Sequence, residues 1–248
     1  MVSISSFSFS SPVGTRELTK WLLGATLLLT VAGVVSGVMQ MELLSRGLKE
    51  EISFLEAHAN DKREQVIASI RLGLYLATSV AFLVWFYRTR KNLSALGGFG
   101  FKHSPGWAVG GFFTPGLNLF LPMQVMREIW HASNPARLES DESVSGPAER
   151  NRLGTPLLVG WWWALFIGMN VLAIIAFRTG SVTNPTPYNL QGMTLFSVLS
   201  DLVSFPCAFL AIAIINRISS WQTERYSLIV HRITLSPPSP ATSPSFGV

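Results

Sequence analysis

The sequence predicts an all-α, polytopic integral membrane protein built as a helical bundle. Of its 248 residues, 48% are hydrophobic and 13% are charged, whereas soluble domains carry about 25% charged residues. The apolar residues form four blocks long enough to cross a bilayer as helices, which takes about 20 residues each. A further apolar block is interrupted by proline and glycine. We therefore expect four spans plus one re-entrant or kinked segment, with five spans as the alternative.

The four predicted spans contain long runs without acidic or basic side chains. They occupy about residues 21–41, 66–87, 153–177 and 193–216. The first run covers 21 residues, or about 31 Å of helix at about 1.5 Å per residue. It exceeds the roughly 7–15 apolar residues of a signal-peptide core, which favours an uncleaved signal-anchor helix. In the last span, Pro206 should kink the helix.

The predicted membrane domain extends over residues 21–235. Before it, residues 1–20 are interpreted as a flexible cytoplasmic tail. After it, residues 236–248 are rich in proline and serine and carry too few apolar side chains to form a core. Such a composition predicts a disordered tail.

The interrupted apolar segment covers residues 105–126. From Trp107 to Met126 it has no acidic or basic residue, but prolines and glycines make it a poor continuous helix. A membrane tolerates the freed backbone groups only where protein or a water-filled cavity shelters them. The segment therefore predicts a buried structural or functional element.

The distribution of lysine and arginine predicts how this segment is placed. If it enters and leaves on one side, 13 basic residues lie on the side of both termini and five on the other. If it crosses, the counts are seven inside against 11 outside, or the reverse with the N-terminus outside. Since basic residues gather in cytoplasmic loops, the re-entrant version with both termini cytoplasmic is favoured.

The residues from the end of the second span through the broken segment resemble a known family. The pattern includes Trp85, Tyr87, Arg88, Asn92, Leu93, Gly97, Pro105, Gly106, Trp107, Val109, Gly110, Phe112, Pro115, Asn118, Pro122, Glu128 and Trp130, with the cluster Trp161–Trp163 in the next span. Over residues 66–220 the chain resembles the bacterial membrane family of domain of unknown function 4328. The resemblance implies a multi-spanning protein of a bacterial plasma membrane and implies no activity.

Arg71 and Asp201 are charged residues inside predicted spans. An unpaired charge costs about 2.5–3.5 kcal/mol at the bilayer centre, so an ion pair between the second and last spans is expected. Two alternatives are that Asp201 is a proton or cation site and that Arg71 extends to the membrane surface.

The candidate structural or functional positions cluster around the broken segment: Arg88, Asn92, Trp107, Pro115, Asn118, Pro122 and Glu128. The Asn118 amide is expected to bond backbone groups released by the prolines, or to coordinate a polar ligand beside unwound carbonyls. Arg88 and Glu128 flank the segment, and either pair with each other or remain two solvated charges.

The bilayer is the expected partner, with anionic lipid headgroups as candidate ligands of a basic cluster. The cluster consists of Arg88, Arg90, Lys91 and Lys102, and topology signalling is the alternative purpose of its charges. Gly33 and Gly37 form a G-x-x-x-G motif, which packs helices closely either within the chain or in a homo-oligomer. Binding to an unidentified protein partner is a further alternative.

No catalytic, metal-binding or cofactor-binding motif was identified in the sequence. The net charge of +5 comes from residues in short loops beside apolar spans, which argues against nucleic acid as a partner. We expect a non-catalytic scaffold or partner-binding membrane protein. A transporter or channel-like protein with a polar site at Asn118 is the alternative, and a membrane-embedded enzyme is third.

Overall fold

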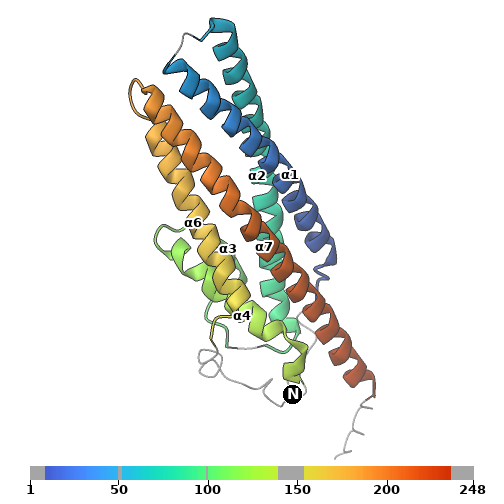
Figure 1. The fold of residues 1–248 in the computed structure, drawn as a ribbon. Helices are drawn as coiled ribbons and strands as arrows, with labels where there is room; N and C mark the ends of the chain where they lie inside the picture. The colour runs from blue at the N-terminus through green and yellow to red at the C-terminus, as the bar shows by residue number, and fades with distance from the viewer. Residues whose placement is uncertain (1–8, 50–51, 99, 139–153, 236–248) are drawn as a thin grey trace, which may run out of the picture.

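The structure is a computed structural model that describes residues 9–49, 52–98, 100–138 and 154–235. Every regular element within these ranges is helical. Four helices are long and apolar enough to cross a membrane: α1 (Val13–Gly47), α2 (Phe54–Ala95), α6 (Leu157–Gly180) and α7 (Pro187–Leu235). They run side by side as a long bundle (Figure 1). The chain is therefore an all-α, multi-pass membrane protein, as the composition predicts.

The four long helices are not packed equally against each other. Helix α1 packs on both α2 and α7, and α7 also forms an extensive interface with α6. At one end of the bundle the broken segment packs against α2, α6 and α7 (Figure 1). This arrangement places the broken segment beside the membrane helices rather than as a fifth long helix.

The broken segment is a helical hairpin, which we call the α3–α4 hairpin. It consists of α3 (Pro105–Gly110), the short 3-10 turn η2 (Leu117–Leu119) and α4 (Leu121–Ser133), followed by the 3-10 turn η3 (Pro135–Leu138). Ser104 caps α3 by accepting a hydrogen bond from the Trp107 backbone. Gly116 has a φ of 78°, which glycine adopts without steric cost. The chain therefore reverses between α3 and α4.

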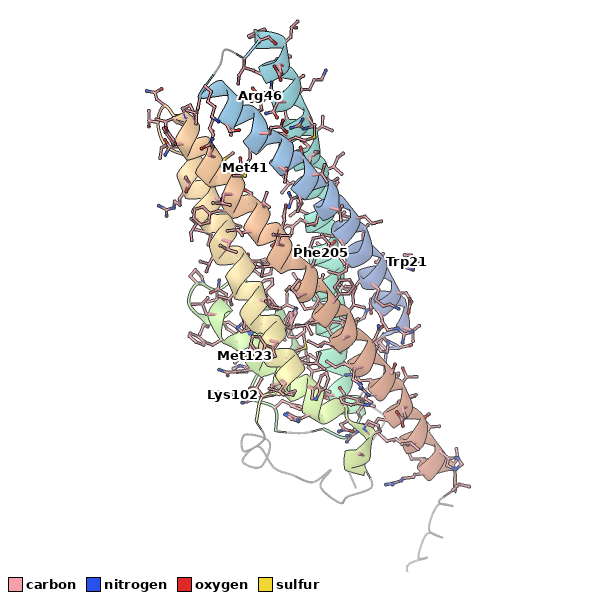
Figure 2. All side chains as sticks on the ribbon, in the orientation of Figure 1. Trp21, Met41, Arg46, Lys102, Met123 and Phe205 are labelled. Carbon is pink, nitrogen blue, oxygen red and sulfur yellow. The ribbon has the colours of Figure 1, made fainter. Side chains whose placement is uncertain are left out.

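The hairpin lies towards one end of the bundle (Figure 1). Figure 2 shows Lys102, just before α3, and Met123, near the start of α4, towards the end opposite Met41 and Arg46. The N-terminal end of α1 and the C-terminal end of α7 also lie towards the hairpin end (Figure 1). The arrangement is that of four long helices with an inserted hairpin.

The hydrophobic core is concentrated at the hairpin end. Its largest buried side chains come from α2, α4, α6 and α7, and include Trp85, Phe86, Leu93, Met126, Ile129, Trp162, Trp163, Ile214, Ile215 and Ile218. Elsewhere many apolar side chains of the long helices are exposed, as expected where helices face lipid rather than water. The core therefore fixes the hairpin against the bundle.

One predicted boundary needs correction, because residues 1–20 are not a flexible tail throughout. Helix α1 begins at Val13, and before it Phe9 stacks on Tyr226 of α7 with ring centroids 4.1 Å apart. The Ser10 backbone also donates to Asn92 Oδ1 over 3.1 Å. These contacts hold Phe9 and Ser10 on the bundle. Residues 1–8 and the predicted disordered tail, 236–248, lie outside the described residues.

Helix α7 is continuous on both sides of Pro206 and continues well past the predicted end of its span at residue 216. In Figure 1 its last turns project beyond the rest of the bundle. Polar side chains anchor the nearer part of this extension, as described below. The exposed C-terminal turns carry Tyr226, Leu228, Val230 and Ile233.

Candidate functional site

A cavity of about 570 Å³ lies between α1, α2, α6, α7 and the α3–α4 hairpin. Most of its lining is apolar, and six aromatic side chains contribute: Tyr75, Phe82, Phe112, Phe113, Trp162 and Phe166. Its lining hydroxyl and amide groups belong to Thr26, Tyr75, Thr78, Ser79, Asn118, Asn170 and Ser204. The volume falls within the range of about 300–1,000 Å³ that is typical of small-molecule sites. This cavity is the candidate functional site.

Aromatic contacts hold the hairpin at one side of the cavity. The ring centroid of Phe82 on α2 lies 6.1 Å from that of Phe112, with the rings edge to face. It lies 6.0 Å from the ring centroid of Trp162 on α6. Such pairs add about 0.5–1.5 kcal/mol beyond the area that they bury. Trp163 Nε1 donates a hydrogen bond to Leu119 O over 2.9 Å. The hairpin is thus attached to α2 and α6 and forms part of the cavity wall.

The tryptophan cluster of α6 divides between two environments. Trp162 and Trp163 are buried, whereas Trp161 is 63% exposed and faces away from the core. This agrees with the 200° arc that three consecutive helical residues cover at about 100° each. Two of the three tryptophans pack against the rest of the bundle, and the third contacts the surroundings.

Asn118 lies at the tip of the hairpin and lines the cavity. Its backbone N–H donates to Thr114 O over 2.9 Å, but its side chain makes no hydrogen bond to any described residue. The expected staple, in which the amide bonds backbone groups released by the prolines, is therefore not formed among those residues. The turn is held instead by Gly116 and by Trp163. Asn118 is left available to a ligand.

The other predicted hairpin positions have different roles. Pro122 is buried at the start of α4, where a proline leaves no helical hydrogen bond unmade. Pro115 and Trp107 are exposed, Trp107 on α3. Neither lines the cavity, so they shape the hairpin or face its surroundings.

The two intramembrane charges meet between α2 and α7. Arg71 Nη2 is paired with Asp201 Oδ1, and the Asp201 side chain is 8% exposed. Gly33 of α1 makes room for this pair, because a Cβ at Gly33 would lie 2.7 Å from Arg71 Nη1 and 3.3 Å from Asp201 Oδ2. The structure thus brings together the two charges that the sequence analysis paired, and adds Gly33 as a third participant.

The G-x-x-x-G motif is used within the chain. Gly33 faces the ion pair, and a Cβ at Gly37 would lie 2.7 Å from Cγ2 of Val198 on α7. Both glycines therefore permit close approach of α1 to its neighbours in the same molecule. Of the two uses left open by the sequence, the structure supports the intrachain one.

We expect Gly37→Leu to destabilise the protein by about 1–3 kcal/mol, because the side chain must push α1 away from α7. Thermal unfolding in detergent measures the effect. Gly24→Leu is the matched control on the same helix, since a Cβ at Gly24 has nothing within 4 Å. Equal melting temperatures for the two variants would contradict this account of the motif.

A buried polar network joins α2, α4 and α7 at the hairpin end. Gln222 Nε2 donates to Thr89 O over 2.9 Å and to Ser133 Oγ over 3.1 Å, while Asn92 Nδ2 donates to Gln222 Oε1 over 3.1 Å. Asn92 Nδ2 also donates to Ser10 O over 2.8 Å. Of these residues, only Asn92 was a candidate position from the sequence.

Two further side chains from α2 and α7 complete the polar contacts at this end. Trp85 Nε1 donates to Ser219 Oγ over 3.0 Å, and Arg225 donates to Leu96 O and Asn134 O. The α7 residues could have been found from their spacing. Ile218, Gln222 and Arg225 are separated by four and three positions, which places them on one face of a helix. That face is buried against α2 and α4.

The basic cluster predicted to bind lipid headgroups is not uniformly available. Arg90 is 3% exposed, donates to His103 O and lies 4.3 Å from the Phe101 ring centroid. It therefore holds the α2–α3 connection in place and does not fit a headgroup ligand. Lys91 and Lys102 are exposed and Arg88 is partly exposed. These three remain candidates.

Arg88 and Glu128 do not pair with each other among the described residues. Glu128 Oε2 is buried without a hydrogen-bond partner there, and so is His103 Nε2. The described residues also contain no group of three or more His, Cys, Asp or Glu side chains able to hold a metal ion. Neither Glu128 nor His103 lines the cavity.

The comparison with protein families identifies most of this chain. The family described as Domain of unknown function (DUF4328) matches residues 49–220. The matched range contains α2, the hairpin, α6 and most of α7, and so includes Asn118 and the Arg71–Asp201 pair. No curated protein matches the chain, and neither does a solved structure. The chain therefore belongs to the family of domain of unknown function DUF4328.

Proposed function

We propose that this protein is a non-catalytic, partner-binding membrane protein that takes a lipid-soluble molecule from the bilayer into the cavity beside its α3–α4 hairpin. The observation that carries the proposal is the cavity of about 570 Å³ with its mainly apolar lining. The hairpin contributes Phe112, Phe113 and Asn118 to that lining. The broken segment is then the element that makes the binding site.

The location of the cavity argues for a ligand that comes from the membrane. Its lining residues on α1, α2 and α6 fall within the predicted charge-free parts of those spans. Several lining residues of these helices and of the hairpin are exposed, among them Leu76, Phe113 and Ile174. An opening bordered by exposed apolar side chains at membrane depth faces lipid, so the bilayer is the source that the site can sample.

The two other functions have less support. A transporter or channel-like role is favoured by the position of Asn118 in the cavity, but a lining without charged residues is poorly suited to ions. For an enzyme, a histidine should lie near a nucleophile in a cleft. The Nε2 atom of His131 instead contacts Gly154 O over 3.0 Å, and His103 does not line the cavity.

We place the protein in a bacterial plasma membrane with both termini in the cytoplasm. The support is that the basic residues are concentrated on the side of the termini, 13 against five, as the positive-inside rule requires. On that side the exposed Lys91 and Lys102, with Arg88, are placed to attract anionic headgroups at about 1 kcal/mol each. A homo-oligomer stays a prediction that the intrachain use of Gly33 and Gly37 does not support.

Filling the cavity tests the binding function. Ala208→Phe introduces a large side chain at a lining residue, whereas Ala213→Phe makes the same change at an exposed position of α7 outside the lining. With the full chain in lipid nanodiscs, we expect a photoactivatable alkyl probe to label cavity peptides of α6 in the wild type and in Ala213→Phe. Labelling should fall in Ala208→Phe, and equal labelling of the two variants would overturn the proposal.

A further inference from the structure

We infer that the molecule held in the cavity is an uncharged amphiphile whose hydroxyl or carbonyl group is bound by Asn118. The inference rests on the proposed binding function and names the chemical class of its ligand. Two observations support this ligand class: the polar groups that line the cavity, and the hydrogen bonds that some of these groups already make within the protein.

The absence of charge in the lining selects against a charged ligand group. None of the cavity-lining residues in the described part of the chain is Asp, Glu, Lys, Arg or His. A charged group moved from water into an apolar site without a counter-charge loses far more solvation than a hydroxyl or carbonyl does. The ligand group inside the cavity is therefore neutral.

Four hydroxyl or amide side chains of the lining already have partners in the protein. Thr26 and Thr78 bond each other over 3.1 Å. Asn170 Nδ2 donates to Phe166 O over 2.7 Å, and Ser204 Oγ donates to Asp201 O over 2.7 Å. The O–H or N–H group that donates in such a bond is no longer available as a donor to a ligand.

Asn118 differs from these residues because its side chain has no hydrogen bond to the described residues. Its amide offers two N–H donors and a carbonyl acceptor. Tyr75, Ser79 and Trp162 also line the cavity without a side-chain hydrogen bond among those residues, but each offers at most one donor, whereas the Asn118 amide offers two donors and an acceptor. A ligand hydroxyl or carbonyl can pair with Asn118, whereas a purely aliphatic ligand leaves the amide unpaired inside an apolar site.

The experiment compares probes that share one chain and differ in their head. Photoactivatable diazirine derivatives of hexadecanol, hexadecane, hexadecanoate and hexadecyltrimethylammonium are titrated into nanodiscs of neutral phospholipid that hold the full chain. Labelling of α6 cavity peptides is measured by mass spectrometry. Hexadecanol is expected to give half-maximal labelling at the lowest mole fraction of the four.

Asn118→Leu tests the residue. We expect it to weaken hexadecanol labelling about two- to tenfold, the effect of one hydrogen bond, and to leave hexadecane labelling unchanged. Asn118→Gln keeps an amide and should retain part of the preference. A loss of labelling by all probes together with a lowered melting temperature would indicate that Asn118 only supports the hairpin, and would overturn the inference.

The remaining outcomes separate this inference from the binding function. Stronger labelling by hexadecanoate or by the ammonium probe, blocked by Ala208→Phe, would keep the binding site and reject its neutral ligand. Equal labelling by hexadecanol and hexadecane in the wild type would reject Asn118 as the recognition residue. If Ala208→Phe and Ala213→Phe behave alike with every probe, the binding function itself fails.

Discussion

Asp201→Ala is expected to lower the free energy of unfolding by about 2.5–3.5 kcal/mol, because it leaves the Arg71 guanidinium without a counter-charge inside the membrane. The two side chains are paired in the structure, and Asp201 is almost completely buried. Arg71→Ala should have a similar cost, since it leaves a buried carboxylate unpaired. Unfolding in mixed micelles, followed by the loss of tryptophan fluorescence, measures both variants.

The double variant decides whether the pair acts as a unit. If the two charges mainly stabilise each other, removing both should cost much less than the sum of the single losses, because neither charge is then left alone. Lys62→Ala, an exposed charge on α2, is the matched control and should change stability little. Additive losses in Arg71→Ala, Asp201→Ala and the double variant would show that the pair is not energetically coupled.

Gln222→Leu is expected to be the second strongly destabilising change. Gln222 is 0% exposed, and its amide joins Thr89, Ser133 and Asn92. Leucine has nearly the same size but leaves these buried groups without a partner, at about 1–3 kcal/mol for each unsatisfied group. We expect a clear fall in melting temperature, together with faster proteolysis of the chain around α4.

Thr223→Val is the control for this substitution. Thr223 is the next residue on α7, is exposed, and its hydroxyl bonds only Ser219 O of its own helix among the described residues. It should therefore melt close to the wild type. If Gln222→Leu and Thr223→Val are equally stable, the network does not hold α4 against α2 and α7.

The spans could be predicted from the sequence because their signal is local. A run of apolar residues long enough to cross a bilayer must become a helix, since lipid offers no other partner for its backbone groups. The same reasoning applies to the broken segment, where Pro115, Gly116 and Pro122 exclude a straight helix. The pairing of Arg71 with Asp201 was also predictable, because an isolated charge in a span is costly and each lacked a nearer partner.

The contacts at the hairpin end were less predictable because they join residues far apart in the chain. Asn92 and Gln222 are separated by 130 positions, and the local sequence around either residue does not indicate that the two are in contact. The sequence does not distinguish Arg90 from the neighbouring basic residues. In the structure, however, Arg90 is buried against Phe101 and the His103 carbonyl. Its role depends on where the chain returns after α2.

What the sequence determined by itself is the class of protein, the helical spans and the break between Pro115 and Pro122, because each follows from the backbone requirements of a few consecutive residues in lipid. What only the tertiary structure decided is how these parts meet: the cavity with Asn118 in its lining, and the intrachain use of Gly33 and Gly37. Those features depend on distances between separate helices. Side-chain packing sets these distances, and no local pattern encodes them.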